Sequence, residues 1–228
     1  MKLNYNILYG TFIHRPNRFI AYVNLSDKKV VCHVPNTGRL KELLYPGAQV
    51  IISHHPSTNR KTEYSLRMVK KGDSWISIDS QLPNLLAYEA ISNGLIKELD
   101  GYSIIKREIN YGNSRFDIQL IGKDTCFIEV KGVTLEKNNW SYFPDAPTQR
   151  GRKHIDEMIE LVNKGYRGVI LFIVQIQYAK GFSPNSTTDI AFAKKLKEAS
   201  KKGIEILAYK CNISPKEVVV VEKIPVVL

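Results

Sequence analysis

Residues 115–131 read RFDIQLIGKDTCFIEVK, and this stretch decides the fold of the second half of the chain. Two runs rich in apolar and β-branched residues flank Gly122-Lys123-Asp124, which is turn chemistry, so the stretch predicts a β-hairpin. Side chains alternate between the two faces of a strand, so Phe127, Glu129 and Lys131 share one face of the second strand. The hairpin therefore presents an acid and a base on the same side of a sheet.

The length of the turn decides whether Asp117 joins them. With a three-residue loop, Ile121 faces Thr125 and Asp117 faces Glu129, with Cβ atoms roughly 5 Å apart. With a two-residue loop the register slips by one residue and Asp117 turns to the opposite face. In the first register the two carboxylates repel each other unless a cation lies between them, and a hard divalent ion suits such oxygen ligands best. Lys131 would then help to activate a water and offset charge on a phosphoryl group.

A Glu-Val-Lys strand is otherwise a solvated face, and two flanking segments favour a site over that reading. A helix predicted upstream carries Glu89. A helix predicted downstream carries Arg150 and His154, which lie four residues apart and therefore on one face. Asp145 precedes this second helix and is expected to cap it.

The element pattern divides the chain near residues 80–83, into a domain at 1–82 and another at 83–228. Short strands separated by turns in the first part predict a small barrel of the oligonucleotide-binding (OB) type, although an SH3-like barrel would give the same pattern. The expected elements there are strands at 19–25, 30–34, 48–53, 62–69 and 75–78, and a helical turn at 38–44.

The second part predicts an α+β or mixed α/β domain, in which helices cover a mixed central sheet. One helix is expected to place Leu85, Leu86, Ile91 and Leu95 on a common face and to stop at Gly94. The expected elements are helices at 84–93, 148–163 and 189–202, and strands at 102–111, 115–121, 126–135, 168–175 and 204–209.

The chain is basic, with a formal net charge of +11 over 228 residues. Residues 1–80 hold 12 Lys and Arg against 5 Asp and Glu, a net of +7, while the remainder holds 21 against 17. Such an excess attracts polyanions, although basic proteins without polyanionic partners are common. Arg39 is the favoured phosphate contact, because it lies at a turn leading into the expected helical turn. The other candidate nucleic-acid contacts are Arg15, Arg18, Arg60, Lys61, Arg150 and His154.

Barrel-type binding also needs aromatic faces on which bases can stack. Phe19, Tyr22, Tyr64 and Trp75 are interleaved with these cations, although strand aromatics lie more often in a core. No base-reading motif accompanies them, so phosphate contact without sequence specificity is expected.

Composition also bounds the setting of the protein. No run of residues approaches the roughly 20 apolar residues of a membrane span, and the first six residues lack the pattern of a signal peptide. Cys32, Cys126 and Cys211 are widely spaced, so they are expected to be buried and reduced. A cytoplasmic location without membrane contact follows as an expectation.

Asp117 followed by Glu129-Val130-Lys131 resembles the Asp…Glu-x-Lys signature of restriction-endonuclease-like nucleases. Further segments resemble the sugar fermentation stimulation protein A family, and the likeness extends over essentially the whole chain. These segments are His33-Val34-Pro35-Asn36-Thr37-Gly38-Arg39-Leu40, Ser114-Arg115-Phe116-Asp117, Phe127 to Leu135, Phe143-Pro144-Asp145-Ala146, and Arg150-Gly151 followed by Lys153-His154.

The resemblance implies an OB-like barrel followed by a nuclease-like domain. It implies Asp117 and Glu129 as ligands of Mg²⁺ or Mn²⁺, Lys131 as the catalytic lysine and Glu89 as a further candidate ligand. It also implies DNA binding without marked sequence preference, with RNA left as an alternative. A metal-dependent nuclease and a non-catalytic DNA-binding regulator of sugar (maltose) metabolism both remain open, as does the oligomeric state.

Two residues depart from the pattern expected of that family. Gly132 stands where Asn is expected, which suggests a looser strand beside the site. Ile176 stands where Arg is often found, which removes one candidate phosphate contact. Neither position belongs to the Asp117, Glu129 and Lys131 triad.

Overall fold

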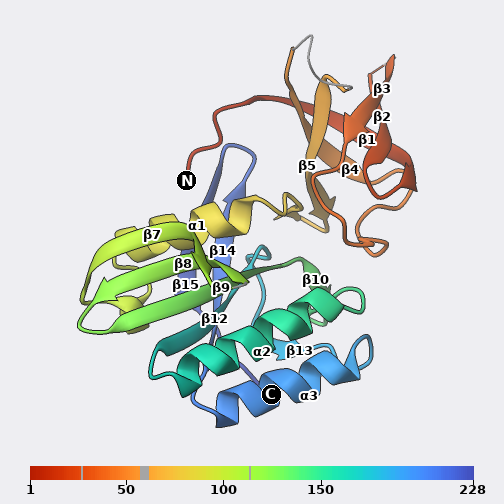
Figure 1. Ribbon diagram of the computed structural model, residues 1–228. Helices are drawn as coiled ribbons and strands as arrows, with labels where there is room; N and C mark the ends of the chain where they lie inside the picture. Colours follow the sequence, from red (N-terminus) through yellow and green to blue (C-terminus); the bar gives the residue numbers. More distant parts are fainter. Residues whose placement is uncertain (27, 57–61, 113) are drawn as a thin grey trace.

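The computed structural model describes residues 1–26, 28–56, 62–112 and 114–228, arranged as an N-terminal barrel and a larger α/β domain (Figure 1). Candidate residues Arg60 and Lys61 fall outside the described residues. The strands of the first part are β1 (Asn6–Asn17), β2 (Ile20–Leu25), β3 (Lys28–His33), β4 (Gln49–His54), β5 (Tyr64–Lys71) and β6 (Ser74–Ser77).

The first part forms a closed barrel. Its strands follow the order β3-β2-β1-β4-β5-β6, and a parallel pairing of β3 with β5 joins the two sides of the ring. Apolar side chains such as Phe12, Val23, Ile52 and Leu66 fill the interior and are almost completely buried. Five of these strands lie where they were predicted, whereas β1 was not predicted. The helical turn expected at 38–44 is confirmed over residues 40–44, where Leu44 N–H donates to Leu40 O at 2.8 Å.

The larger domain is built on a six-stranded mixed sheet with the order β15-β14-β12-β9-β8-β7. The pairs β9–β12 and β12–β14 are parallel, and the outer pairs are antiparallel. The strands of the sheet are β7 (Tyr102–Tyr111), β8 (Ser114–Gly122), β9 (Thr125–Val133), β12 (Arg167–Val174), β14 (Glu205–Ser214) and β15 (Glu217–Lys223).

A smaller sheet of β10 (Leu135–Lys137), β11 (Trp140–Phe143) and β13 (Gly181–Pro184) adjoins it. This sheet was not predicted. Lys71, at the end of β5, reaches across to it, and its Nζ lies 2.5 Å from Oε2 of Glu136 on β10. The ion pair therefore ties the barrel to the second domain.

Helices cover both faces of the six-stranded sheet, as Figure 1 shows. On one face lies α1 (Leu82–Ser92), followed by a short 3₁₀ helix (Lys97–Leu99); on the other lie α2 (Gln149–Asn163) and α3 (Ile190–Lys201). The expected stop of α1 is confirmed, because Gly94 has a φ of 65°, which glycine adopts without strain.

The buried face of α1 differs from the predicted one. Leu86 and Ile91 are buried, but Leu85 and Leu95 are 40% and 44% exposed. Ala87 and Ala90 contribute to the buried face instead, so the apolar stripe is narrower and made of smaller residues than the leucines suggested.

All three cysteines are buried and unpaired, as predicted. In the part of the chain that the structure describes, none of the helices has the length and apolar character needed to cross a membrane.

Candidate active site

The hairpin β8–β9 has the register of a three-residue loop. Ile121 pairs with Thr125 and Ile118 pairs with Ile128. This ladder ends at Ile118 and Ile128, so the three-residue loop is confirmed for the paired residues. Asp117 and Glu129 lie one residue beyond the ladder, and continuing the register would set them opposite each other, as the metal hypothesis requires.

Asp117 is held at the point where the regular pairing of the hairpin ends. The backbone N–H of Val130 donates to its Oδ2 at 2.8 Å, and Asn84 Nδ2 on α1 donates to its Oδ1 at 2.6 Å. Burial and then the nearby charge of Glu129 raise the pKa of Asp117 above its ordinary value, although these hydrogen bonds and the charge of Lys131 oppose the shift. The Asp117 carboxylate is thus fixed in place, while burial and the charge of Glu129 disfavour its ionised form.

Glu129 is the most enclosed carboxylate of the site, with its side chain 4% exposed. Lys131 Nζ donates to its Oε1 at 2.5 Å, and His154 Nδ1 donates to the same oxygen. Burial acts to raise the pKa of Glu129, but the hydrogen bonds and charges of His154 and Lys131 outweigh burial and hold the pKa below its ordinary value. Glu129 therefore keeps its negative charge in a nearly dry environment.

The second oxygen of this carboxylate has an unusual position. Oε2 of Glu129 is buried and has no hydrogen-bond partner among the described residues. A buried acceptor without a partner costs about 1–3 kcal/mol, more when it is charged. An ionised, unpartnered oxygen next to a second carboxylate is a suitable ligand for a cation.

His154 reaches the site from α2. Thr148, whose hydroxyl accepts from Gly151 N–H at 3.0 Å, caps the helix, so the expected cap by Asp145 is wrong. Arg150 Nε lies 3.4 Å from His154 Nε2, which confirms that the two residues share a face. His154 was expected as a phosphate contact, but its Nδ1 is engaged with Glu129, a role that its spacing from Arg150 did not reveal.

Glu89 lies elsewhere on α1. Its carboxylate pairs with the amino group of Met1 at 2.9 Å, and its side chain is 41% exposed. The structure brings Asp117, Glu129 and Lys131 together with His154 and does not add Glu89 to them. Asn84, which the sequence reasoning missed, is the α1 residue that contacts Asp117.

The described residues contain no group of three or more His, Cys, Asp or Glu side chains arranged to hold a metal ion. The candidate ligands are thus the two carboxylates alone. Mg²⁺ is commonly held by one or two carboxylates, with waters and substrate phosphates completing its shell, so this donor set fits such an ion. Thiolate-seeking metals do not fit, because both candidate ligands are carboxylates.

The candidate nucleic-acid contacts of the barrel fall into two groups. Arg15 is half-buried and donates to the carbonyl oxygens of Arg18, Asn36 and Gly38 at 2.5–2.8 Å, so it braces the loop. The side chains of Arg18 and Arg39 are exposed, and Arg18 lies 4.8 Å above the Phe19 ring. The backbone N–H of Arg39 donates to Asp145 Oδ2 at 2.9 Å.

The four aromatic residues interleaved with these cations are not core residues. Phe19 is 46% exposed, and the other three are half-buried. Tyr22 stacks on His14, Tyr64 stacks on His54, and Trp75 packs against Tyr9.

Comparison with known proteins gives matches along most of the chain. The model of the SfsA N-terminal OB domain matches residues 13–78, and that of the sugar fermentation stimulation protein RE domain matches residues 81–217. A sugar fermentation stimulation protein homolog of Thermoanaerobacter sp. (strain X514) is 48% identical over 230 residues, covering 100% of both chains. A homolog of Clostridium botulinum (strain Langeland) is 49% identical over 220 residues, 96% of each chain.

A solved structure shares the whole architecture. The structure of Pyrococcus furiosus SfsA in complex with Ca²⁺ is similar with a TM-score of 0.91 and 30% sequence identity, covering 100% of this chain and 98% of that one. The barrel followed by a mixed α/β domain is therefore the arrangement of that protein as well.

Proposed function

This chain belongs to the sugar fermentation stimulation protein family, and we propose that it binds DNA and cleaves a phosphodiester bond at the Asp117, Glu129 and Lys131 site with Mg²⁺ or Mn²⁺. The observation that carries the proposal is a pair of carboxylates, the half-buried Asp117 with a raised pKa and the buried Glu129 with an oxygen that has no hydrogen-bond partner among the described residues. The P. furiosus relative, which binds Ca²⁺ in its solved structure, supports a divalent ion as the missing partner.

Each residue has a distinct part in such a reaction. Asp117 and Glu129 would hold the ion, which when bound supplies a Lewis acid that polarises the phosphoryl group. Lys131, with its side chain 15% exposed, is partly screened from water and would stabilise negative charge developing on the phosphoryl oxygens. His154 orients the Glu129 carboxylate, because it donates to Oε1 and leaves Oε2 without a hydrogen-bond partner among the described residues.

The exposed cations Arg18 and Arg39, and Arg150 beside the site, would contact phosphates. Phosphate contacts position a nucleic acid without reading its sequence, which agrees with binding that lacks sequence preference. The net charge of +11 supports the same conclusion, because phosphate neutralisation releases counterions.

The test compares wild-type protein with Lys131→Ala on end-labelled single- and double-stranded DNA over a manganese and magnesium series. Loss of one such charge-stabilising group is expected to slow cleavage about 10²–10³-fold and to leave DNA affinity nearly unchanged. Lys201→Ala, which removes an exposed lysine on α3, serves as the matched control and should cleave normally.

Wild-type protein that binds DNA in a salt-dependent way but cuts neither substrate with either ion would refute the catalytic half of the proposal. The non-catalytic regulator would then be the function that remains. Parallel reactions on single-stranded RNA decide between the two nucleic acids.

A further inference from the structure

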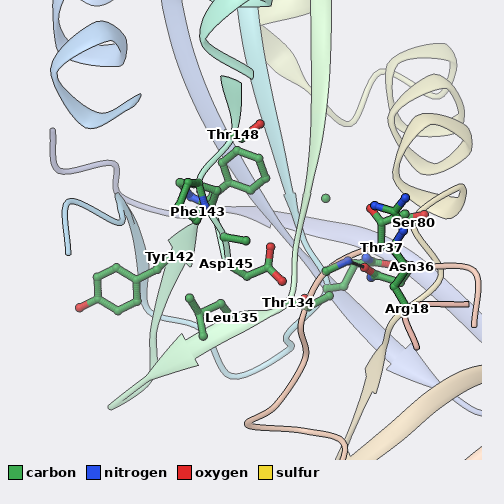
Figure 2. Close-up of a pocket in the computed structure, with 16 residues that line it drawn as sticks. Arg18, Asn36, Thr37, Ser80, Thr134, Leu135, Tyr142, Phe143, Asp145 and Thr148 are labelled. Atoms are coloured by element: carbon green, nitrogen blue, oxygen red, sulfur yellow. Dashed lines mark hydrogen bonds between the residues drawn. The ribbon is translucent and has the colours of Figure 1, made fainter. Parts of the chain in front are cut away.

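A cleft of about 360 Å³ lies where the barrel meets the second domain, as Figure 2 shows. Arg18, Asn36 and Ser80 line it from the barrel side, and Asp145 reaches toward them from the opposite wall. The volume is at the lower end of the range for small-ligand sites, about 300–1,000 Å³. None of the residues of the candidate active site lines this cleft, although Gly132, which does, directly follows Lys131.

The floor of the cleft is formed where two parallel strands end. Gly132 on β9 pairs with Ile173 on β12, and Gln175 follows that strand and donates its N–H to Val133 O at 2.9 Å. Ligands of open α/β sheets bind beyond the carboxyl ends of parallel strands. A Cβ on residue 132 would lie 2.6 Å from Cγ of Pro83, so glycine is needed for this close packing. The expectation that Gly132 loosens the strand is therefore wrong.

Gln175 places a buried hydrogen-bond acceptor in the cleft. Its side chain lines the cleft, the residue is 1% exposed, and its Oε1 has no hydrogen-bond partner among the described residues. Leaving a buried acceptor unpaired is unfavourable, so a site that keeps one is suited to a ligand that donates a hydrogen bond.

The walls of the cleft are fixed across the domain boundary. Arg39 N–H donates to Asp145 Oδ2, and a Cβ on Gly38 would lie 2.4 Å from that same oxygen. Gly38 therefore permits the loop of the barrel to approach Asp145 closely. On the barrel side, Asn36 is held by its own hydrogen bond to Ile78 O at 2.8 Å. The cleft is thus preformed rather than a gap between loosely placed parts.

The charges of the lining decide what kind of group fits. Asp145 and the Gln175 Oε1 are acceptors, and the carboxylate of Asp145 would repel a phosphate. A nucleobase amino group donates hydrogen bonds and carries no negative charge. Arg18, exposed at the rim and packed on the Phe19 ring, can meet the phosphate of the same nucleotide outside the cleft.

We propose that this cleft binds the amino-bearing base of one unpaired nucleotide of the bound strand, with the amino group donating to Gln175 Oε1. The proposal deepens the nucleic-acid binding of the proposed function and rests on it. Recognition of an unstacked base through its hydrogen-bonding edge is an established way of holding a strand for chemistry.

The experiment titrates the full-length protein with 2′-deoxynucleoside 5′-monophosphates in EDTA, followed by NMR. Since the metal is absent, a failure of catalysis does not affect the outcome. The three monophosphates with an amino group (dAMP, dGMP and dCMP) are expected to bind more tightly than dTMP and than 2-deoxyribose 5-phosphate. Replacing dAMP by 2′-deoxynebularine 5′-monophosphate, which has hydrogen in place of the amino group, is expected to weaken binding by about three- to tenfold, as for the loss of one hydrogen bond.

Gln175→Leu should weaken dAMP binding by a similar factor and remove the difference between dAMP and its analogue. Gln177→Leu is the matched control, because Gln177 donates to Ser74 Oγ at 3.3 Å and is not among the residues that line the cleft. It should bind as the wild type does. The analogue comparison in wild-type protein does not depend on how a variant folds.

Three results would overturn the proposal. The first is equal binding of 2-deoxyribose 5-phosphate and dAMP. The second is an undiminished effect of the amino group in a folded Gln175→Leu protein. The third is the absence of any binding at millimolar dAMP, dGMP and dCMP. DNA cleavage and DNA binding by the wild type are measured separately, so the proposed function can survive each of these results.

Discussion

The hairpin β8–β9 and the barrel both carry charged side chains, but they use them differently. In the hairpin, Asp117 and Glu129 lie directly beyond the paired residues, and neighbouring donors orient both carboxylates. In the barrel, Arg15 on β1 directs its guanidinium at the backbone of the loop that holds Asn36 and Gly38, while Arg39 leaves its side chain exposed. The comparison teaches that register predicts which strand residues meet, whereas a count of basic residues does not separate structural cations from binding ones.

The largest expected effect tests the hairpin. Asp117→Asn removes one of the two charges proposed to hold the ion and keeps the size of the side chain. Metal-dependent cleavage is expected to fall at least about 10²-fold, as for other charge-stabilising groups. Cleavage rates over a manganese series, with the unfolding temperature as a check of folding, measure the effect. Cleavage at the wild-type rate would show that Asp117 does not serve the reaction.

The next effect tests the structural arginine of the barrel. Arg15→Ala leaves the carbonyl oxygens of Arg18, Asn36 and Gly38 without their donor. The free energy of unfolding is expected to fall by about 1–3 kcal/mol, and the salt dependence of DNA binding should stay unchanged. Urea unfolding and binding isotherms measure the two quantities, with the exposed Lys41→Ala as the control. A loss of salt dependence without a loss of stability would place Arg15 among the phosphate contacts.

A smaller effect tests the exposed arginine. Arg39→Ala is expected to leave stability unchanged, because the hydrogen bond to Asp145 comes from the backbone N–H. The slope of log K against log salt should decrease by about 0.7–0.9, the value for one lost phosphate contact. Fluorescence anisotropy with labelled DNA at several salt concentrations measures the slope. An unchanged slope would mean that Arg39 points away from the bound strand.

The smallest effect tests the ion pair between Lys71 of the barrel and Glu136 on β10 of the second domain. Burial acts to raise the pKa of Glu136, but hydrogen bonds from Lys71 and from Asn139 N–H outweigh it and hold the pKa below its ordinary value. Because the pKa of Glu136 is lower in the folded protein than its ordinary value of 4.5, ionised Glu136 stabilises the fold at pH values above 4.5. This stabilisation is lost as the pH falls through the pKa of the folded state.

Glu136→Gln should therefore lower the free energy of unfolding near neutral pH by about 0.2–1 kcal/mol, because Lys71 is partly exposed and solvent screens the pair. The difference from wild type should shrink as the pH falls below about 4. Urea unfolding over this pH range measures it. A difference that stays constant with pH would show that Glu136 acts through packing rather than charge.

The sequence predicted the parts of the fold that repeat a simple period. The hairpin register followed from the loop at Gly122-Lys123-Asp124, and the buried strand β12 followed from an uninterrupted apolar run. Strand β1 was missed because Phe12 is its only fully buried residue, so its apolar pattern is weak. The sheet of β10, β11 and β13 was missed because each strand has only three or four residues.

Residues whose partners are distant in sequence could not be assigned from local pattern. Asp145 is a residue type that commonly caps helices, yet its carboxylate accepts a hydrogen bond from the backbone N–H of Arg39, 106 residues away. Asn84 and His154 reach the hairpin from two helices on opposite faces of the sheet. Ile176 stands where a phosphate-binding Arg was expected and is completely buried, which agrees with its apolar side chain.

Strand β9 lies in the interior of its sheet, with β8 on one side and β12 on the other. Its backbone cannot shift toward β8 without breaking the parallel ladder to β12, so Glu129 is carried by a strand that is held on both sides at the roughly 4.8 Å spacing of neighbouring strands. Mg²⁺ binds oxygen at about 2.0–2.1 Å and Ca²⁺ at about 2.3–2.6 Å. Since the strand is held rigidly, we expect the waters of the coordination shell, rather than the polypeptide, to move when ions of different radius bind.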